Sequence, residues 1–176
     1  MIRKYTCFVL AILLIAGGIF GPTFFGNVLA AGDLLIYEDS LNTTWQDVSW
    51  SATRNLVSTE QVASGLQSIK VSLSPWGALR LRSGPWGSPT NINSADYSNI
   101  SMSVYGGVTG GLVLLKLEND QAQTFPTKTF NLSANIWNTV VATMAELNPA
   151  GQTIHGFYLQ EYNGQSRTFY VDDVKL

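Results

Sequence analysis

The chain has 176 residues and a net charge of −2 near neutral pH, from 10 Lys or Arg against 12 Asp or Glu. No run of basic residues is present that could follow a phosphate backbone, so this balance excludes nucleic acid as a main partner. The chain has a single histidine, His155, whereas a His-rich transition-metal site needs several. Its position at the start of a predicted strand favours a structural role over a catalytic one.

The N-terminal segment has the composition of a secretory signal peptide. Two cations near the start are followed by an uninterrupted apolar run over residues 8–20, and small residues lead to an expected cleavage after Ala30 or Ala31. We therefore expect residues 1–31 to be a signal peptide and the protein to be secreted to the extracellular space. The alternative is an uncleaved membrane anchor, because the apolar stretch is nearly long enough to span a bilayer.

Removal of this leader changes the chemistry of what remains. It takes away Cys7, the only cysteine, and with it any disulfide or thiol catalysis. It also takes away Arg3 and Lys4, which lowers the net charge from −2 to −4. The remaining length suits one hydrophobic core, so residues 32–176 are expected to form a single domain.

Beyond the leader, short alternating segments separated by Gly, Pro, Asn and Ser predict an all-β domain. Apolar and polar residues alternate over 69–74, 79–82, 100–105 and 157–162, so each of these strands has one buried and one polar face. Residues 111–117 are apolar at both parities, which predicts a central strand with cover on both sides over part of its length.

Two later segments complete the pattern. Residues 137–142 predict another strand, and residues 144–147 predict one helical turn that ends before Pro149 and Gly151. Roughly ten strands of this length, joined by turns, predict two antiparallel sheets packed face to face.

Two acid pairs lie near the two ends of the predicted domain. Glu38 and Asp39 follow an apolar lead, while Asp172 and Asp173 interrupt the apolar pattern of the last strand, residues 169–174. If the two ends pair in one sheet, the four carboxylates converge, and their repulsion favours a hard cation with oxygen ligands. The alternative is that these acids are solvated at strand ends.

Two tryptophans stand out because their positions do not fit the core. Trp76 and Trp86 each occupy a Pro-Trp-Gly triplet, on turns that flank the strand carrying Arg80 and Arg82. A rigid indole stacks on the C–H face of a sugar, while Arg, Gln and Tyr side chains bind its hydroxyls. The alternative is that the rings fold back and cap a sheet edge.

Other aromatic residues extend this prediction. Trp45 and Trp50 are five positions apart, so in a regular strand they face opposite sides and one of them belongs to the core. Tyr105, Tyr158 and Tyr162 share the parity of the polar faces, although strand tyrosines are often simply half-buried. The predicted ligand-binding residues are Trp50, Trp76, Arg80, Arg82, Trp86, Tyr105, Tyr158 and Gln160.

Four segments, in this order, resemble the β-jelly-roll carbohydrate-binding modules of the galactose-binding-domain-like class. They are an acidic first segment over 36–41, the segment 45–50, a Ser-Gly-x-x-Ser hairpin over 64–71 and an aromatic-Val-Asp-Asp-Val strand over 169–174. The resemblance covers nearly the whole predicted domain. It implies an antiparallel two-sheet β-sandwich of jelly-roll type, with about ten strands.

The resemblance also implies a function and a metal. It implies a stand-alone, non-catalytic module that binds a polysaccharide or glycan, and it supports the aromatic surface as a type of site rather than any single residue in it. It further implies a structural calcium that joins the chain ends. Glu38 and Asp172 are its implied carboxylate ligands, with Asp39 and Asp173 as second choices and carbonyl oxygens of residues 64–68 completing the shell.

Two alternative functions share this fold. A jelly-roll hydrolase or lyase needs two carboxylates that face one cleft. Glu118, Asp120, Glu146 and Glu161 are available, but only the first two share a parity, at a strand end where solvated turn acids are ordinary. We therefore predict a binding protein rather than an enzyme. The second alternative is a structural or adhesive surface protein without a sugar ligand.

Overall fold

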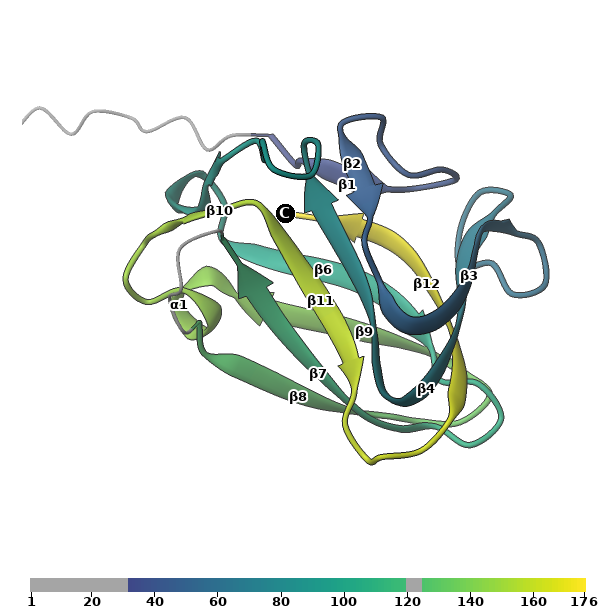
Figure 1. Ribbon diagram of the computed structural model, residues 1–176. Helices are drawn as coiled ribbons and strands as arrows, with labels where there is room; N and C mark the ends of the chain where they lie inside the picture. Colours follow the sequence, from purple (N-terminus) through teal and green to yellow (C-terminus); the bar gives the residue numbers. More distant parts are fainter. Residues whose placement is uncertain (1–31, 120–124) are drawn as a thin grey trace, which may run out of the picture.

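A computed structural model describes residues 32–119 and 125–176, so the predicted signal peptide and Asp120 lie outside the described residues. These ranges contain twelve strands, one helix and one 3₁₀ turn (Figure 1). The first strands are β1 (Leu35–Tyr37), β2 (Trp45–Asp47), β3 (Trp50–Ser58), β4 (Ser68–Ser83), β5 (Ile92–Asn93) and, after the 3₁₀ turn Ser94–Asp96, β6 (Asn99–Tyr105). The later elements are β7 (Gly111–Glu118), β8 (Thr127–Leu132), β9 (Trp137–Thr143), α1 (Met144–Leu147), β10 (Thr153–Ile154), β11 (Gly156–Glu161) and β12 (Arg167–Lys175).

The long strand β4 connects the two layers of the fold. The main sheet has the order β8-β7-β11-β4-β12-β6-β9, and a separate small sheet pairs β5 with β10. The second half of β4 pairs with β11, and its first half pairs with β12. We call β8, β7, β11 and the second half of β4 the β11 layer, and the first half of β4, β12, β6 and β9 the β12 layer. Figure 1 shows β11 and β7 in front of β6 and β9.

The sequence pattern predicts two strands where the structure has the single 16-residue strand β4. The strand bends at its centre, where Trp76 has φ +63° and Ser51 on the paired strand β3 has φ +47°. A Cβ atom on Gly77 would lie 2.3 Å from the carbonyl oxygen of Ser51. The bend therefore needs a glycine at this close approach, and it lets one strand serve both layers.

The two ends of the domain lie side by side, as predicted. Strand β1 pairs with β12 in antiparallel register, with Leu35 opposite Lys175. Leu34 and Leu176 exchange backbone hydrogen bonds of 3.0 and 3.1 Å. The acidic residues of both ends are thus attached to one region of the β12 layer.

The inward residues of both layers form one hydrophobic core. Alternate positions of the predicted strands are buried, including Ile69, Val71, Leu79, Leu81, Ile100, Val104, Leu115, Leu117, Phe157, Leu159, Phe169 and Val171. Trp45 is buried and Trp50 is half-buried, which confirms that one of the two belongs to the core. The helical turn α1 is confirmed as well, with a capping box between Thr143 and Glu146.

The prediction for residues 111–117 is confirmed for cover on both faces, since Val113, Leu114 and Leu115 are all buried, but it is wrong for a central position in the sheet. Strand β7 lies next to the edge strand β8, with β11 on its other side. The apolar residues on the other side of β7 face the outer surface. There Leu114 lies between the cross-strand residues Gln160 and Thr129, which leave it nearly covered. No helix among the described residues is long and apolar enough to cross a membrane.

Candidate functional site

The outer surface of the β11 layer brings together the predicted ligand-binding residues, with the exception of Tyr105. Strand register places Arg80 of β4, Tyr158 of β11 and Lys116 of β7 in one row on this surface. In the next row, Gln160 lies between Ala78 and Leu114. We call this surface the β11 face.

The centre of the β11 face is an aromatic pair held by hydrogen bonds. The rings of Trp50 and Tyr158 meet edge to face with centroids 5.2 Å apart. The Trp76 carbonyl oxygen accepts hydrogen bonds from Trp50 Nε1 at 3.1 Å and from Gln160 Nε2 at 2.9 Å. Burial, followed by the Glu118 carboxylate, raises the pKa of Tyr158, so its phenol keeps its proton as a hydrogen-bond donor.

Trp86 forms one end of the β11 face and is 69% exposed. The guanidinium carbons of Arg82 and Arg80 lie 5.0 and 5.9 Å from its ring centroid, which are cation–π distances. Arg80 Nε also donates to both carboxylate oxygens of Glu118, at 2.8 and 2.9 Å. Trp86 is therefore held flat over charged groups while most of its ring stays accessible.

Arg82 was predicted to contact a ligand, and the structure corrects this. The residue lies on the predicted face but is only 3% exposed, because it is buried beneath neighbouring groups that include the Trp86 ring. Its role is to support Trp86 from below. Arg80, which is partly exposed, keeps polar atoms at the surface.

Trp76 lies at the other end of the face and is 52% exposed. Its ring packs edge to face against Tyr162, with centroids 5.7 Å apart. The backbone of this tryptophan is held by Glu161, whose carboxylate accepts from Trp76 N at 3.4 Å. The position of the Trp76 and Tyr162 rings therefore depends on Glu161, a buried acid that the sequence indicated only as a possible catalytic residue.

Glu161 is fully buried and organises the hairpin between β11 and β12. It accepts hydrogen bonds from Asn163 N at 2.8 Å, Gln165 N at 3.1 Å and Arg167 Nε at 3.0 Å. Burial raises the pKa of Glu161, but the backbone donors and Arg167 outweigh it and hold the pKa below its usual value. In the sequence, Glu161 shares its strand parity with the core residues Phe157 and Leu159. This parity was the signal that Glu161 is buried and that its charge needs a buried partner.

The structure places Tyr105 on the opposite side of the molecule. It lies on β6, directly across from Tyr170 of β12 and Trp137 of β9. Its ring contacts both partners edge to face, at 5.9 and 5.6 Å between centroids. Parity correctly assigned Tyr105 to an outer surface, but β6 belongs to the β12 layer, so Tyr105 is not part of the β11 face.

The four acids at the chain ends do not form the predicted ligand cluster. Asp172 is fully buried, and its carboxylate accepts from the amides of Ala63 at 2.9 Å, Ser64 at 3.3 Å and Asp173 at 3.0 Å. Asp39 Oδ1 accepts from two further amides, those of Leu66 and Gln67. The hairpin at residues 63–67 thus presents N–H donors to the acids, where a calcium shell would need carbonyl oxygens.

The other two acids take different positions. Asp173 accepts from the hydroxyl of Ser64, and Glu38 is exposed to solvent. Within residues 32–119 and 125–176, no three His, Cys, Asp or Glu side chains gather as a possible metal-ligand set. These residues therefore do not fit a calcium held by converging carboxylates, and a structural calcium stays a prediction of the resemblance.

The carboxylates considered for hydrolysis have other contacts. Glu118 pairs with Arg80, and Glu146 pairs with Lys128 at 2.7 Å. Glu161 is fully buried, and His155 is buried as well. The three described carboxylates thus have structural partners rather than an open position facing a common cleft.

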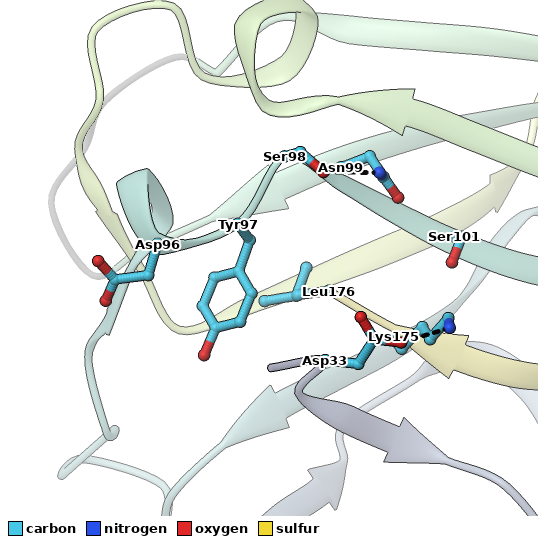
Figure 2. Close-up of a pocket in the computed structure, with 8 residues that line it drawn as sticks. All are labelled: Asp33, Asp96, Tyr97, Ser98, Asn99, Ser101, Lys175 and Leu176. Atoms are coloured by element: carbon cyan, nitrogen blue, oxygen red, sulfur yellow. Dashed lines mark hydrogen bonds and ion pairs between the residues drawn. The ribbon is translucent and has the colours of Figure 1, made fainter. Parts of the chain in front are cut away.

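A cavity of about 430 Å³ lies beside the chain ends (Figure 2). Lys175 pairs with Asp33 at its side, and the half-buried ring of Tyr97 and the side chain of Leu176 form part of its wall. Tyr97 is the one aromatic residue in the described lining, so this cavity offers less stacking surface than the β11 face.

No family model and no curated protein matches the sequence. The fold does match solved structures of family 29 carbohydrate-binding modules. One of these matches with a TM-score of 0.57 and 13% identity, over 82% of this chain and 86% of that chain. A variant in complex with mannohexaose has a TM-score of 0.58 and 12% identity, over 82% and 89% of the two chains. Another variant, in complex with cellulohexaose, has a TM-score of 0.58 and 14% identity, over 84% and 91%.

These matches confirm the predicted fold. The described chain is an antiparallel β-sandwich of the jelly-roll type found in family 29 carbohydrate-binding modules.

Proposed function

We propose that this protein is a secreted, non-catalytic module that binds a polysaccharide through the β11 face. The observation that carries the proposal is a series of exposed and half-buried aromatic rings on one sheet surface, with hydrogen-bonding groups between them. Trp86 marks one end, Trp50 and Tyr158 the centre, and Trp76 the other end. Gln160 and the Arg80–Glu118 pair supply polar atoms beside the rings.

The dimensions of this series suit an extended chain rather than a single sugar. Gly156 lies opposite Arg82 at the Trp86 end of the face, and Tyr162 lies at the Trp76 end. The chain advances six residues between them, which corresponds to about 20 Å along an extended strand. Several sugar residues can lie along such a surface, with their apolar faces on the rings. The solved modules of this fold that hold mannohexaose and cellulohexaose support ligands of this length.

The proposal predicts that two substitutions weaken binding. Trp86→Ala and Trp50→Ala should each weaken retardation in affinity electrophoresis by about tenfold or more, because stacking rings are energetic hot spots. Gels containing glucomannan, hydroxyethylcellulose or galactomannan provide the measurement. Leu66→Ala is the matched control, since Leu66 is an exposed apolar residue on the hairpin at residues 63–67.

Three results would contradict the proposal in different ways. Unchanged retardation of both tryptophan variants would exclude the β11 face as the site. Absence of retardation in every gel would favour a structural or adhesive protein. Release of reducing sugars from the same polysaccharides would show an enzyme.

A further inference from the structure

A second row of aromatic residues crosses the outer face of the β12 layer. Strand register places Lys70 of β4, Tyr170 of β12, Tyr105 of β6 and Trp137 of β9 side by side. Four neighbouring strands span about 14 Å, so the row is long enough to contact more than one sugar residue. The β11 face does not contribute to this row.

A cavity of about 410 Å³ lies over part of this row. Tyr105 and Tyr170 line it together with Lys70, Gln61, Asn135 and Val108. The volume lies within the usual range of sites for small ligands. Val108 is 82% exposed and adds an apolar rim beside the rings.

Hydrogen bonds hold the floor of this cavity in place. The Tyr170 hydroxyl donates to Glu60 Oε2 at 2.6 Å, and Lys70 Nζ donates to both Glu60 oxygens at 2.6 and 2.7 Å. Lys70 Nζ also lies 5.8 Å from the Tyr170 ring centroid. Because Lys70 and Glu60 neutralise each other, the cavity favours an uncharged ligand over an anion or a cation.

Polar groups are also available at the rim. Among the described residues, the side-chain amides of Gln61 and Asn135 make no hydrogen bond within the protein. The backbone of Asn135 is held by a 2.7 Å hydrogen bond from its N–H to the Gly107 carbonyl oxygen. These amides can donate to and accept from hydroxyl groups of a ligand.

The wall of the cavity requires glycine. Gly107 has φ +64°, and a Cβ atom on it would lie 2.1 Å from the carbonyl oxygen of Thr168. A Cβ on the preceding Gly106 would lie 2.1 Å from the Ser133 carbonyl oxygen. The loop after β6 can therefore pack directly on two neighbouring backbones, which keeps the cavity formed before a ligand arrives.

From these observations we propose that the β12 layer carries a second saccharide site, which we call the β12 site, for uncharged pyranose residues. Tyr105 and Trp137 provide rings for the apolar sugar faces, and Gln61 and Asn135 bind hydroxyl groups. A module with sites on both outer faces can bind two chains, or two parts of one branched chain. The β12 site uses the sugar-binding function proposed above but none of the residues of the β11 face.

The test is an NMR titration of the ¹⁵N-labelled protein with mannohexaose and cellulohexaose, which reads the two surfaces separately. We expect shifts of the Trp137 indole N–H and of the Asn135 and Gln61 amides. Tyr105→Ala should weaken this response by about tenfold while leaving the response of the Trp50 indole intact. Trp50→Ala should do the reverse.

A second variant covers the case in which Tyr105→Ala does not fold. Asn135→Ala changes only the rim and should weaken the same response severalfold. The proposal is overturned if neither hexasaccharide shifts the signals of the β12 site, or if both variants respond like wild type. A response confined to the β12 site would instead contradict the proposed role of the β11 face and leave the β12 site standing.

Discussion

Replacement of Glu161 by glutamine is expected to lower the free energy of unfolding by about 3–5 kcal/mol, the usual cost of breaking a buried ion pair. The carboxylate is fully buried, and it bonds to Arg167 and to three backbone amides. Glutamine has the same shape but offers one acceptor oxygen and leaves the Arg167 guanidinium without a carboxylate partner. Urea unfolding followed by tryptophan fluorescence measures the change.

The pH dependence of this effect has a defined sign. The pKa of Glu161 is lower in the folded state than its ordinary value of 4.5. Its carboxylate therefore stabilises the fold above about pH 4.5, and this contribution is lost as the pH falls through the lower folded pKa. The stability difference between wild type and Glu161→Gln should be constant near neutral pH and shrink in acid.

Glu146→Gln is the matched control for this experiment. Its ion pair with Lys128 lowers the pKa of Glu146 to about 2, but the pair is exposed at the surface. Exposed pairs contribute little, so this variant should unfold almost as wild type does. Equal effects of the two substitutions would contradict the role assigned to Glu161.

Replacement of Asp172 by asparagine is expected to cost about 3 kcal/mol of stability, because it leaves buried backbone amides without an acceptor oxygen. The Ala63, Ser64 and Asp173 amides all donate to this carboxylate, and asparagine turns an N–H₂ group toward some of them. Asp173→Asn is the matched control. Asp173 is partly exposed and has φ +51°, a conformation that asparagine tolerates well.

Asp172 should show the opposite pH dependence to Glu161. Burial raises the pKa of Asp172 above its ordinary value of 3.8, although its amide partners act against this. A raised folded pKa gives a contribution that is full below the unfolded pKa and is lost as pH rises through the folded pKa. The difference between wild type and Asp172→Asn should therefore be larger near pH 4 than at pH 7.

The same variant tests the structural calcium. If calcium joins the chain ends, EDTA should lower the melting temperature of the wild type by several degrees and leave that of Asp172→Asn unchanged. The amide contacts predict that Asp172→Asn is destabilised in EDTA as well. Identical wild-type melting with and without EDTA would contradict a structural calcium and leave the contact between the ends to the pairing of β1 with β12.

Much of the fold was predictable because strand alternation is a local property. The pattern of Phe157, Leu159 and Phe169 identified core positions. The similar apolar and acidic sequences of the two ends suggested that they pair in one sheet, and the structure shows this pairing. The bend in β4 was not predictable from alternation. It depends on the contact between Gly77 and Ser51, which are far apart in the sequence.

The candidate site was predictable in residue type but only partly in location. Trp76 and Trp86 were assigned to the surface because their Pro-Trp-Gly triplets do not fit a core strand, and both are exposed. Arg82 was assigned to the correct face of its strand, but the Trp86 ring covers it. The position of that ring depends on tertiary packing, so alternation could not predict it. Tyr170 of the β12 site was not singled out, because its row forms only when four strands pair.

The sequence by itself determined which side of its strand each residue occupies, because side chains alternate with a period of two. Only the tertiary structure decided which layer each strand joins, because strand pairing is a non-local property. Tyr105 and Tyr158 have the same outward parity, yet β6 pairs with β12 and β9 whereas β11 pairs with β4 and β7. This difference separates one predicted surface into two outer faces.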